Sequence, residues 1–522
     1  MAYNEQFIAI GKEADLVSAL ASGNIKDTSI VFLEETGKEA IRAQGKSYQA
    51  VPSNGRDGQV LMASNGKGVW ADLDVTDTLS YGVEWKPNVA DPVLTRVGNM
   101  NYHKSLPIQS GMKGCIYNPK EKKVVYWLDE DNWNYKKGGN PDKGEVEDLA
   151  RLDGYDGEVF VYVPEFYIKS WDEADRRAVR ISLTKIDETW EHQPALFMGA
   201  YRDTVLNTVP EDMGYLSTLE VNTAISVAND AAYCRGGNNN SANDALEDIF
   251  RRQLGKCRTA IQRSTFRAYT RKASKEIMSY RQYKNILYWL WVIEYANFNS
   301  QAAFNSELTS EGFHQGGMGP GLTTMGNWSE YNGYYPISPN GYTNEFGNGT
   351  GVKDLVIPEF TYGADNTVRA AQTLKATRWR GIENPFGDIW HNVDGIIIDA
   401  DADNHPNNMN YVYTTDDPTK YGDTLADIAN MVLSGLEVHT GGYTKEWDLG
   451  TTAEIIPRLM GGNTTQYKCD YHWTGNKNTT LRTLFLGGYA DLGASAGLGY
   501  FTSNFGVAHS DAHVGFRSVS VV

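Results

Sequence analysis

Turn signals near the N-terminus are spaced so closely that the strands between them can hold only a few residues. Asn-Gly and other glycine-containing turns recur through residues 53–70, and Ser29–Leu33 upstream predicts one more short strand. Leu16–Leu20 predicts a single short helix. Because an isolated hairpin is only marginally stable, we predict that residues 1–80 form a β-rich module that needs several chains wound together.

The strongly acidic balance of the chain limits its partners. A formal net charge of −17 disfavours binding to nucleic acid. One region has the opposite charge, and its basic residues are Arg251, Arg252, Lys256, Arg258, Arg263, Arg267, Arg271, Lys272 and Lys275. We interpret them as a solvated face that neutralises the acidic remainder or pairs with a neighbouring subunit, with a nucleic-acid patch as the alternative. We expect no nucleic-acid partner.

Cysteine usage and hydropathy bear on where such a protein is made. The four cysteines, Cys115, Cys234, Cys257 and Cys469, form no C-x-x-C pair, and we predict buried thiols in a protein made in a reducing cytoplasm. Met1–Asp15 lacks the pattern of a secretory signal. The most apolar stretch, Ile286–Ala296, is too short to span a bilayer and contains Glu294, so we expect no membrane insertion.

After residue 80 the pattern predicts an α+β protein. Short apolar runs bounded by turns indicate a small β region over residues 81–170. Residues 171–522 form the remaining domain, with helices expected near Ser241–Leu254, Ser274–Tyr280 and Tyr283–Asn297. Long loops rich in Gly, Asn and Tyr occupy Gly312–Val352, and loops of this length usually serve function.

Four landmarks follow one another in the last domain. A helix ends in Trp291–Ala296, then come Asn384–Val393, Leu486–Tyr489 and Val514–Val519. This order resembles the formylglycine-generating, or sulfatase-modifying, branch of the C-type lectin fold. The resemblance implies that residues 171–522 are a large C-type-lectin-like domain.

The residues of these landmarks suit such a core. Trp390 stands in a short apolar run that can anchor a core, and Gly487–Gly488 permit close backbone approach. In the terminal Gly-Phe-Arg we expect Phe516 to point inward and Arg517 to pair locally.

Other segments resemble fibre and receptor-binding proteins of tailed gut bacteriophages, including crAss-like phages. The N-terminal stretches are SIVFLEET, GKSYQAV and GRDGQVLMASNGKGVWADL. Later stretches are Tyr102–Ser110, Tyr233–Asn239, Phe266–Lys272, Arg380–Gly387 and Cys469–Thr474. The resemblance implies a homotrimeric fibre on the head, collar or tail of a virion, attached to other virion proteins through its N-terminus. It implies an adhesin function for the last domain, toward a host surface glycan or protein. Some relatives diversify the last segment by a retroelement.

Catalytic signatures are missing from the sequence. Enzymes of the sulfatase-modifying branch use a cysteine pair near the C-terminal strand, and this chain has no cysteine between Gly488 and Gly515. It also has no G-x-S-x-G, H-E-x-x-H or P-loop motif. We therefore expect a binding protein with no catalytic residues and no cofactor. The alternative is a capsule-degrading fibre, or depolymerase.

Aromatic and short polar side chains gather between Asp470 and His513, with small residues between them. Aromatic rings stack on sugars or peptides, while Asn, Asp and His supply polar contacts. We expect about half of these side chains to be structural, with Tyr489 and Phe501 as candidates for the core. The candidate ligand-binding residues are Tyr471, Trp473, Asn476, Asn478, Tyr489, Asp491, Tyr500, Asn504, His509, Asp511 and His513.

One loop and one histidine have the composition of metal ligands. Asp399–Asn404 alternates acidic residues as a calcium loop does, but it lacks Gly at the sixth place and has Asn410 at the twelfth. We expect a solvated acidic loop, with calcium as the alternative. His391 has no second histidine near it in sequence, so we expect it to be structural and expect no metal site.

Overall fold

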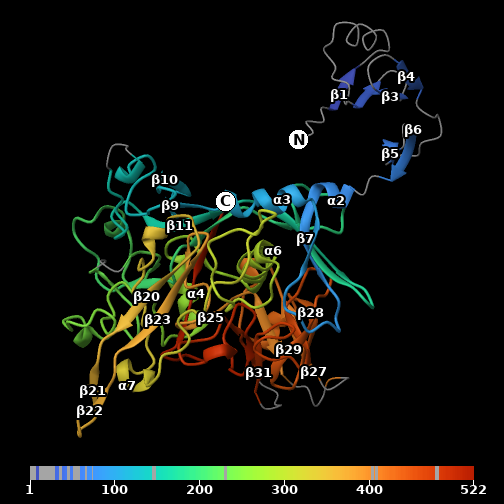
Figure 1. The fold of residues 1–522 in the computed structure, drawn as a ribbon. Coiled ribbons are helices and arrows are strands. Elements are labelled where there is room, and N and C mark those ends of the chain that lie inside the picture. The colour runs from blue at the N-terminus through green and yellow to red at the C-terminus, as the bar shows by residue number, and fades with distance from the viewer. Residues whose placement is uncertain are drawn as a thin grey trace. The chain divides into compact units, whose positions relative to one another are not determined.

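A computed structural model describes residues 75–522 and six strands of residues 1–74. Within 75–522, the described part leaves out residues 144–147, 229–231, 401–404, 406–408 and 476–480. The chain divides into two compact units, Met1–Thr78 and Leu79–Val522 (Figure 1). The architecture is β-rich, with 34% of residues in strands and 15% in helices, which is compatible with the expected α+β class.

The described residues before position 75 form short strands, as expected. A four-stranded sheet has the order β1 (Phe7–Ile10), β2 (Ile30–Leu33), β3 (Lys38–Ala43) and β4 (Ser47–Ala50). The turn-rich stretch forms a hairpin of β5 (Gln59–Ser64) and β6 (Lys67–Asp72). The strand expected at Ser29–Leu33 is confirmed as β2, whereas Leu16–Leu20 lies outside the described residues.

Two sheets of the unit Leu79–Val522 join segments far apart in sequence. The first has the order β10 (Lys123–Trp127), β9 (Lys113–Asn118), β11 (Glu158–Val163), β15 (Leu196–Gly199), β36 (Ser518–Val521) and β19 (Glu276–Ile277). The second has the order β14 (Glu191–Gln193), β12 (Phe166–Asp172), β13 (Arg177–Ser182), β7 (Ser80–Trp85) and β8 (Thr95–Gly98). Residues 81–170, where we expected a small β region, thus share both sheets with residues 171–522.

The later strands form further sheets. One has seven strands in the order β30 (Ile456–Met460), β29 (Gly442–Asp448), β31 (Tyr471–Thr474), β34 (Phe501–Ser503), β33 (Phe485–Leu486), β25 (Trp390–Asn392) and β35 (Val514–Gly515). Another has β28 (Val432–Val438), β27 (Met409–Thr414), β26 (Ile396–Asp399) and β32 (Leu481–Arg482). One three-stranded sheet has the order β20 (Gly351–Ile357), β23 (Gln372–Trp379) and β24 (Ile382–Glu383). A second has the order β17 (Ala224–Ile225), β16 (Thr204–Leu206) and β18 (Cys234–Arg235). A hairpin is formed by β21 (Phe360–Tyr362) and β22 (Thr367–Arg369).

A buried helix lies in the core of this unit. It begins as α5 (Tyr280–Gln282), continues as a π-helical segment (Tyr283–Leu290) and ends as α6 (Trp291–Tyr295). All side chains of the last two segments are buried, and most of them are apolar. The two charged ones have partners: Lys284 lies near Glu191 and Glu454, and Glu294 pairs with Arg380. The helix predicted at Tyr283–Asn297 is confirmed, with its start three residues earlier.

The other two expected helices are wrong. Ser241–Leu254 contains only a 3₁₀ turn at Ser241–Asn243, and Ser274–Tyr280 contains the short strand β19. In the first stretch the side chains of Asn240 and Asp248 accept backbone N–H groups two residues ahead. Such local bonds compete with the helical hydrogen bonds.

A helix that apolar periodicity did not predict is α4 (Arg263–Arg271), and its buried side includes two arginines. Arg263 and Arg267 are buried together with Phe266 and Thr270. Arg267 binds Asp394 (Nε–Oδ2, 2.6 Å) and Asp423 (Nη1–Oδ2, 2.9 Å). Arg263 also binds Asp423 (Nη2–Oδ1, 2.7 Å).

The interpretation of the basic region as a solvated face is wrong for its four buried residues, whereas the other five are partly or fully exposed. The buried residues are Lys256, Arg263, Arg267 and Lys275. Lys256 is buried and donates to the backbone carbonyl of Phe250. Lys275 is buried and lies 2.6 Å from Glu158 and 3.6 Å from Asp203. Lys275 points inward toward acids that are themselves buried, because a buried charge needs a partner, whereas backbone carbonyls hold Lys256.

The terminal Gly-Phe-Arg lies in the core. Phe516 stacks on Phe266 of α4, with ring centroids 4.3 Å apart. Arg517 donates to the carbonyls of Gly199 (2.6 Å), Ala200 (2.8 Å) and Glu383 (2.8 Å). Phe516 is thus inside as expected, but Arg517 does not pair locally, since its acceptors are more than 130 residues away in sequence.

Two further expectations concern single residue types. The expected burial of Trp390 is confirmed, and a Cβ on Gly488 would come within 2.6 Å of the Ala496 Cβ, so this position requires glycine. All four cysteines are free and buried, as predicted. Among the described residues, no helix combines the length and apolarity that a membrane crossing requires.

The Lys275 ion pairs give a prediction about stability. Lys275→Met leaves Glu158 and Asp203 buried without their cation, and we expect the free energy of unfolding to drop by about 3–5 kcal/mol. Lys272→Met, which removes a partly exposed lysine three residues earlier, should cost less than about 1 kcal/mol. Urea unfolding followed by tryptophan fluorescence measures both. Equal effects of the two substitutions would contradict the structural role of Lys275.

Candidate ligand-binding site

Strand β31 places an aromatic pair on one of its faces. Tyr471 and Trp473 point the same way, while His472 between them is buried. Trp473 has 47% of its surface exposed. Its ring lies 6.4 Å from that of Tyr471 at an interplanar angle of 23°. Tyr443 on β29 meets Tyr471 edge to face at 5.1 Å. β31 therefore displays an aromatic patch whose most exposed member is Trp473.

The buried His472 fixes β31 to its neighbours. Its Nδ1 lies 3.0 Å from the carbonyl oxygen of Phe501, and its Nε2 lies 3.1 Å from that of Val438. Nε2 also lies 3.4 Å from the Glu437 carboxylate. The Ser503 hydroxyl donates to the same carboxylate at 2.5 Å. The imidazole thus connects β31 to β34 of its own sheet and to the end of β28 in another sheet, and these contacts support the aromatic pair on the opposite face of β31.

A second aromatic group gathers around His513. The ring centroid of Tyr489 lies 4.9 Å from that of His513, and Trp328 in α7 (Trp328–Asn332) lies 5.7 Å from Tyr489. Tyr334, which is 41% exposed, packs edge to face on Trp328 at 5.4 Å. Both added residues come from the loops of Gly312–Val352, so these loops and the last segment meet here.

Two buried rings connect the two groups. Tyr500 contacts Tyr471 at 5.7 Å and Trp390 at 4.8 Å, and Trp390 contacts Tyr489 at 5.3 Å. Tyr500 is only 5% exposed. Its assignment as a ligand-binding residue is corrected, because its ring is enclosed between neighbouring rings and supports the site from below. We call the connected set Tyr334, Tyr443, Tyr471, Trp473, Tyr489, Tyr500, Trp328, Trp390 and His513 the aromatic network.

An acid lies between two histidines at one end of this network. Asp511 Oδ2 is 3.7 Å from His509 Nε2, and Asp511 Oδ1 is 3.6 Å from His513 Nδ1. Both separations exceed hydrogen-bonding distance. Burial lowers the pKa of both histidines, while the Asp511 carboxylate acts in the opposite direction. Burial also raises the pKa of Asp491, near Tyr489.

The other residues named between Asp470 and His513 differ in where the structure places them. Asn476 and Asn478 lie outside the described residues. Phe501 is fully buried, as we considered for it. The Asn504 carbonyl accepts from Arg482 Nη1 at 2.7 Å, so its backbone holds β32. Sequence reasoning omitted Tyr443 from the site, and only strand pairing brings β29 beside β31.

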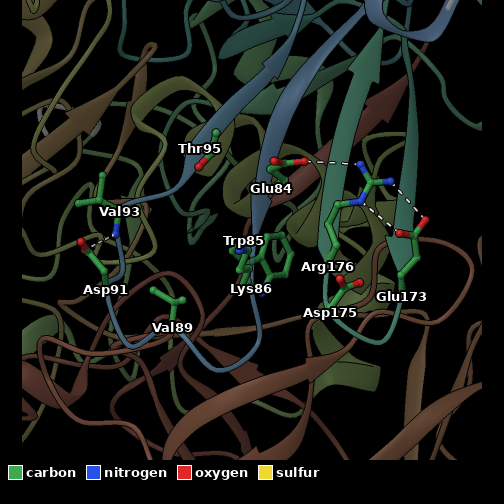
Figure 2. Close-up of a pocket in the computed structure, with 10 residues that line it drawn as sticks. All are labelled: Glu84, Trp85, Lys86, Val89, Asp91, Val93, Thr95, Glu173, Asp175 and Arg176. Atoms are coloured by element: carbon green, nitrogen blue, oxygen red, sulfur yellow. Dashed lines mark hydrogen bonds and ion pairs between the residues drawn. The ribbon is translucent and has the colours of Figure 1, made fainter.

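A shallow pocket of about 440 Å³ lies elsewhere, between the β7–β8 and β12–β13 hairpins (Figure 2). Arg176 points between Glu173, whose Oε2 lies 3.2 Å from its Nε, and Glu84, whose Oε2 lies 3.6 Å from its Nη1. Asp91 accepts from the Val93 amide at 2.9 Å. Most of the charge that lines this pocket is thus already engaged by the protein.

No metal site is apparent in the described part of the chain. Within it, no group of three or more His, Cys, Asp and Glu side chains is arranged to hold an ion. In the acidic loop, Asp399 lies 3.3 Å from His405 Nε2, while Asp401 and Asp403 lie outside the described residues. His391 is buried with Nε2 2.8 Å from Arg202 Nη2, and burial lowers its pKa well below the usual value, which suits a structural histidine.

Comparisons with known proteins identify no family for this chain. No protein-family model and no curated protein matches the sequence. A solved structure with some likeness is that of the Major Tropism Determinant U1 variant, with 9% identity, 99% coverage of each chain and a TM-score of 0.22. At this TM-score the likeness carries no argument about this chain.

The lowered histidine pKa values predict how stability responds to pH. In the unfolded chain a histidine takes up its proton near pH 6.5, whereas folded His513 resists protonation until a lower pH. Lowering the pH from 7.5 to 5 therefore favours the unfolded state, and wild-type protein should lose more stability over this range than His513→Gln. Urea unfolding at both pH values measures the difference. An identical loss in both proteins would contradict a depressed pKa at His513.

Proposed function

We propose that this chain is a fibre protein of a tailed-bacteriophage virion that binds the host surface through its aromatic network. The observation that carries the proposal is the pairing of a half-exposed tryptophan, Trp473, with a fixed base of buried rings and hydrogen bonds. Exposed, immobilised aromatic rings offer large contact area at low entropic cost, which suits recognition of a glycan or protein surface.

The polar groups near the network support the same role. Asp491, His509 and Asp511 are at least partly exposed and can exchange hydrogen bonds with a ligand, while the rings contact its apolar surface. A site of this composition can bind a ligand without a catalytic nucleophile. We therefore propose that the chain is a binding protein, and the alternative is an enzyme that degrades the host capsule.

The finer architecture belongs to the proposal as well. Residues 171–522 would form a C-type-lectin-like receptor-binding domain, with 81–170 as the adjoining β region. Residues 1–80 would hold three chains together and attach to other virion proteins at the head, collar or tail. Support comes from the sequence resemblances, from the order of the helix, β25, β33 and β36 along the chain, and from the shortness of strands β1–β6.

Substitution separates contact residues from supporting ones. Trp473→Ala should weaken adsorption to host cells by on the order of thirtyfold, or about 2 kcal/mol, with an unchanged melting temperature. Tyr471→Ala and His509→Ala should act in the same direction. Tyr500→Ala should instead lower stability by about 3–5 kcal/mol because its ring is buried. Adsorption of the purified protein and thermal unfolding provide the two measurements.

The control uses another exposed aromatic residue. Tyr362 in the β21–β22 hairpin is also 47% exposed, and Tyr362→Ala should leave adsorption unchanged. If Trp473→Ala, Tyr471→Ala and His509→Ala all adsorb like wild type, the receptor site lies elsewhere. Release of reducing sugars from purified host capsule would replace the binding proposal with a depolymerase.

Oligomeric state tests the role of the N-terminal unit. We expect the full chain to sediment as a trimer at micromolar concentration in analytical ultracentrifugation, because strands of four to six residues bury little surface alone. A chain that begins at Leu79 should sediment as a monomer if it keeps the near-UV circular dichroism of the full chain. A monomeric full-length protein would contradict the proposal.

A further inference from the structure

A cleft of about 400 Å³ opens on the sheet that holds β9, β10 and β11. It is unrelated to the aromatic network: Figure 1 shows β9–β11 at the upper left and β31 at the bottom of the same unit. The residues on which its chemistry depends are Lys113, Trp127, Glu130, Lys137, Tyr162 and Asn348. Its volume is in the range of sites that hold one small ligand.

Two aromatic rings form the apolar part of the cleft. Trp127 at the end of β10 and Tyr162 on β11 meet edge to face, with centroids 6.1 Å apart. Tyr162 also packs on Phe197 at 5.4 Å. Both rings are partly buried and rest on a buried cluster of Cys115, Tyr117, Phe160 and Phe197. They therefore keep their positions whether or not a ligand is present.

Backbone hydrogen bonds fix the residues around these rings. Lys113 is the cross-strand partner of Tyr162. The Lys137 amide donates to the Trp127 carbonyl at 2.9 Å, and the Asn348 amide donates to the Glu130 carbonyl at 2.8 Å. Each polar residue of the cleft is thus tied through its main chain to a neighbouring strand or loop.

The side-chain amide of Asn348 has one group, Nδ2, that can still donate a hydrogen bond to a ligand. Its Oδ1 accepts from the Gly114 amide at 2.8 Å and from Trp133 Nε1 at 3.0 Å. These two bonds set the orientation of the amide, so Nδ2 is the group that can donate to a ligand.

The charge of the cleft is opposite to that of the protein. Two lysines against one glutamate give it an excess of one positive charge, in a chain whose net charge is −17. Neither Lys113 nor Lys137 forms a side-chain ion pair with another residue that the structure describes. Two exposed lysines and two aromatic residues that line one cleft match a ligand that has an anionic group attached to an apolar surface.

We infer that this cleft binds an acidic sugar, a pyranose ring that carries a carboxylate. The C–H face of the ring packs on Trp127 and Tyr162, and the carboxylate accepts from Lys113 and Lys137. The hydroxyl groups donate to the Glu130 carboxylate and accept from Asn348 Nδ2. A sugar acid offers a partner of the right kind to each of these groups: a carboxylate for the lysines, hydroxyls that both donate and accept, and an apolar ring face. A peptide carboxylate has only its backbone N–H to donate to Glu130.

Three small probes test the assignment on the full-length protein. Saturation-transfer NMR and titration of tryptophan fluorescence measure the affinity for sodium glucuronate, for glucose and for N-acetylphenylalanine. Glucuronate should bind best. Glucose, which lacks the carboxylate, should bind more weakly by on the order of tenfold or more. Added sodium chloride should weaken glucuronate binding, because salt screens the exposed ammonium groups.

Variants locate the binding. Lys113→Gln combined with Lys137→Gln should reduce glucuronate affinity to that of glucose, with an unchanged circular dichroism spectrum. Lys123→Gln, an exposed lysine on β10 that does not line the cleft, should leave the affinity unchanged. Tyr162→Phe keeps the ring and should also retain binding.

Several results would overturn the inference. They are absence of glucuronate binding, equal affinity for glucuronate and glucose, or unchanged affinity in the double lysine variant. Tighter binding of N-acetylphenylalanine would assign the cleft to a peptide carboxylate instead. Each outcome is independent of host adsorption through Trp473, so the two proposals stand or fall separately.

Discussion

The guanidinium of Arg517 is the interaction on which the unit Leu79–Val522 most depends. It donates to the carbonyls of Gly199, Ala200 and Glu383, and so ties the last strand to two segments far away in sequence. Burial lowers the pKa of Arg517 to about 9, and the three carbonyl oxygens that accept from its Nη1 and Nη2 offset part of the cost of burying the charge, while its buried Nε has no partner. β36 can therefore lie between β15 and β19 inside a sheet rather than at its edge.

The same principle recurs where the chain buries other charges. Arg263 and Arg267 join α4 to Asp394 and Asp423, and Lys275 joins β19 to Glu158 on β11. Removing one partner of such a pair is costly, since it leaves an isolated charge in a medium of low dielectric constant. Buried cations thus connect segments that are distant in sequence. Ion pairs fix the relative positions of these segments more specifically than apolar contacts alone would.

This rigid interior explains how the exposed sites are built. The aromatic network extends from buried Trp390 and Tyr500 to partly exposed Tyr471 and exposed Trp473, so the outer rings rest on the core. The cleft at Trp127 likewise rests on the buried Phe160 cluster. Both proposed sites have rings held by the core, and a ligand that bound there would lose little entropy in ordering them.

Features that depend on neighbouring residues could be predicted from the sequence. Turn spacing predicted the short strands of residues 1–80, the local pattern predicted a helix at Tyr283–Asn297, and aromatic density marked Asp470–His513 as a candidate site. The direction in which individual side chains point depends on long-range packing and could not be predicted. α4 was not predicted because its buried side carries Arg263 and Arg267, whose acidic partners lie more than 120 residues away. Tyr500 and Trp473 were both candidates for ligand binding, but in the folded chain the ring of Tyr500 is buried against Tyr471 and Trp390. The cleft at Trp127 was not predicted, since Lys113, Trp127 and Asn348 come together only when β9, β10 and a distant loop pack. Local patterns specify strands, helices and turns, whereas burial and ion pairing depend on contacts between residues hundreds of positions apart.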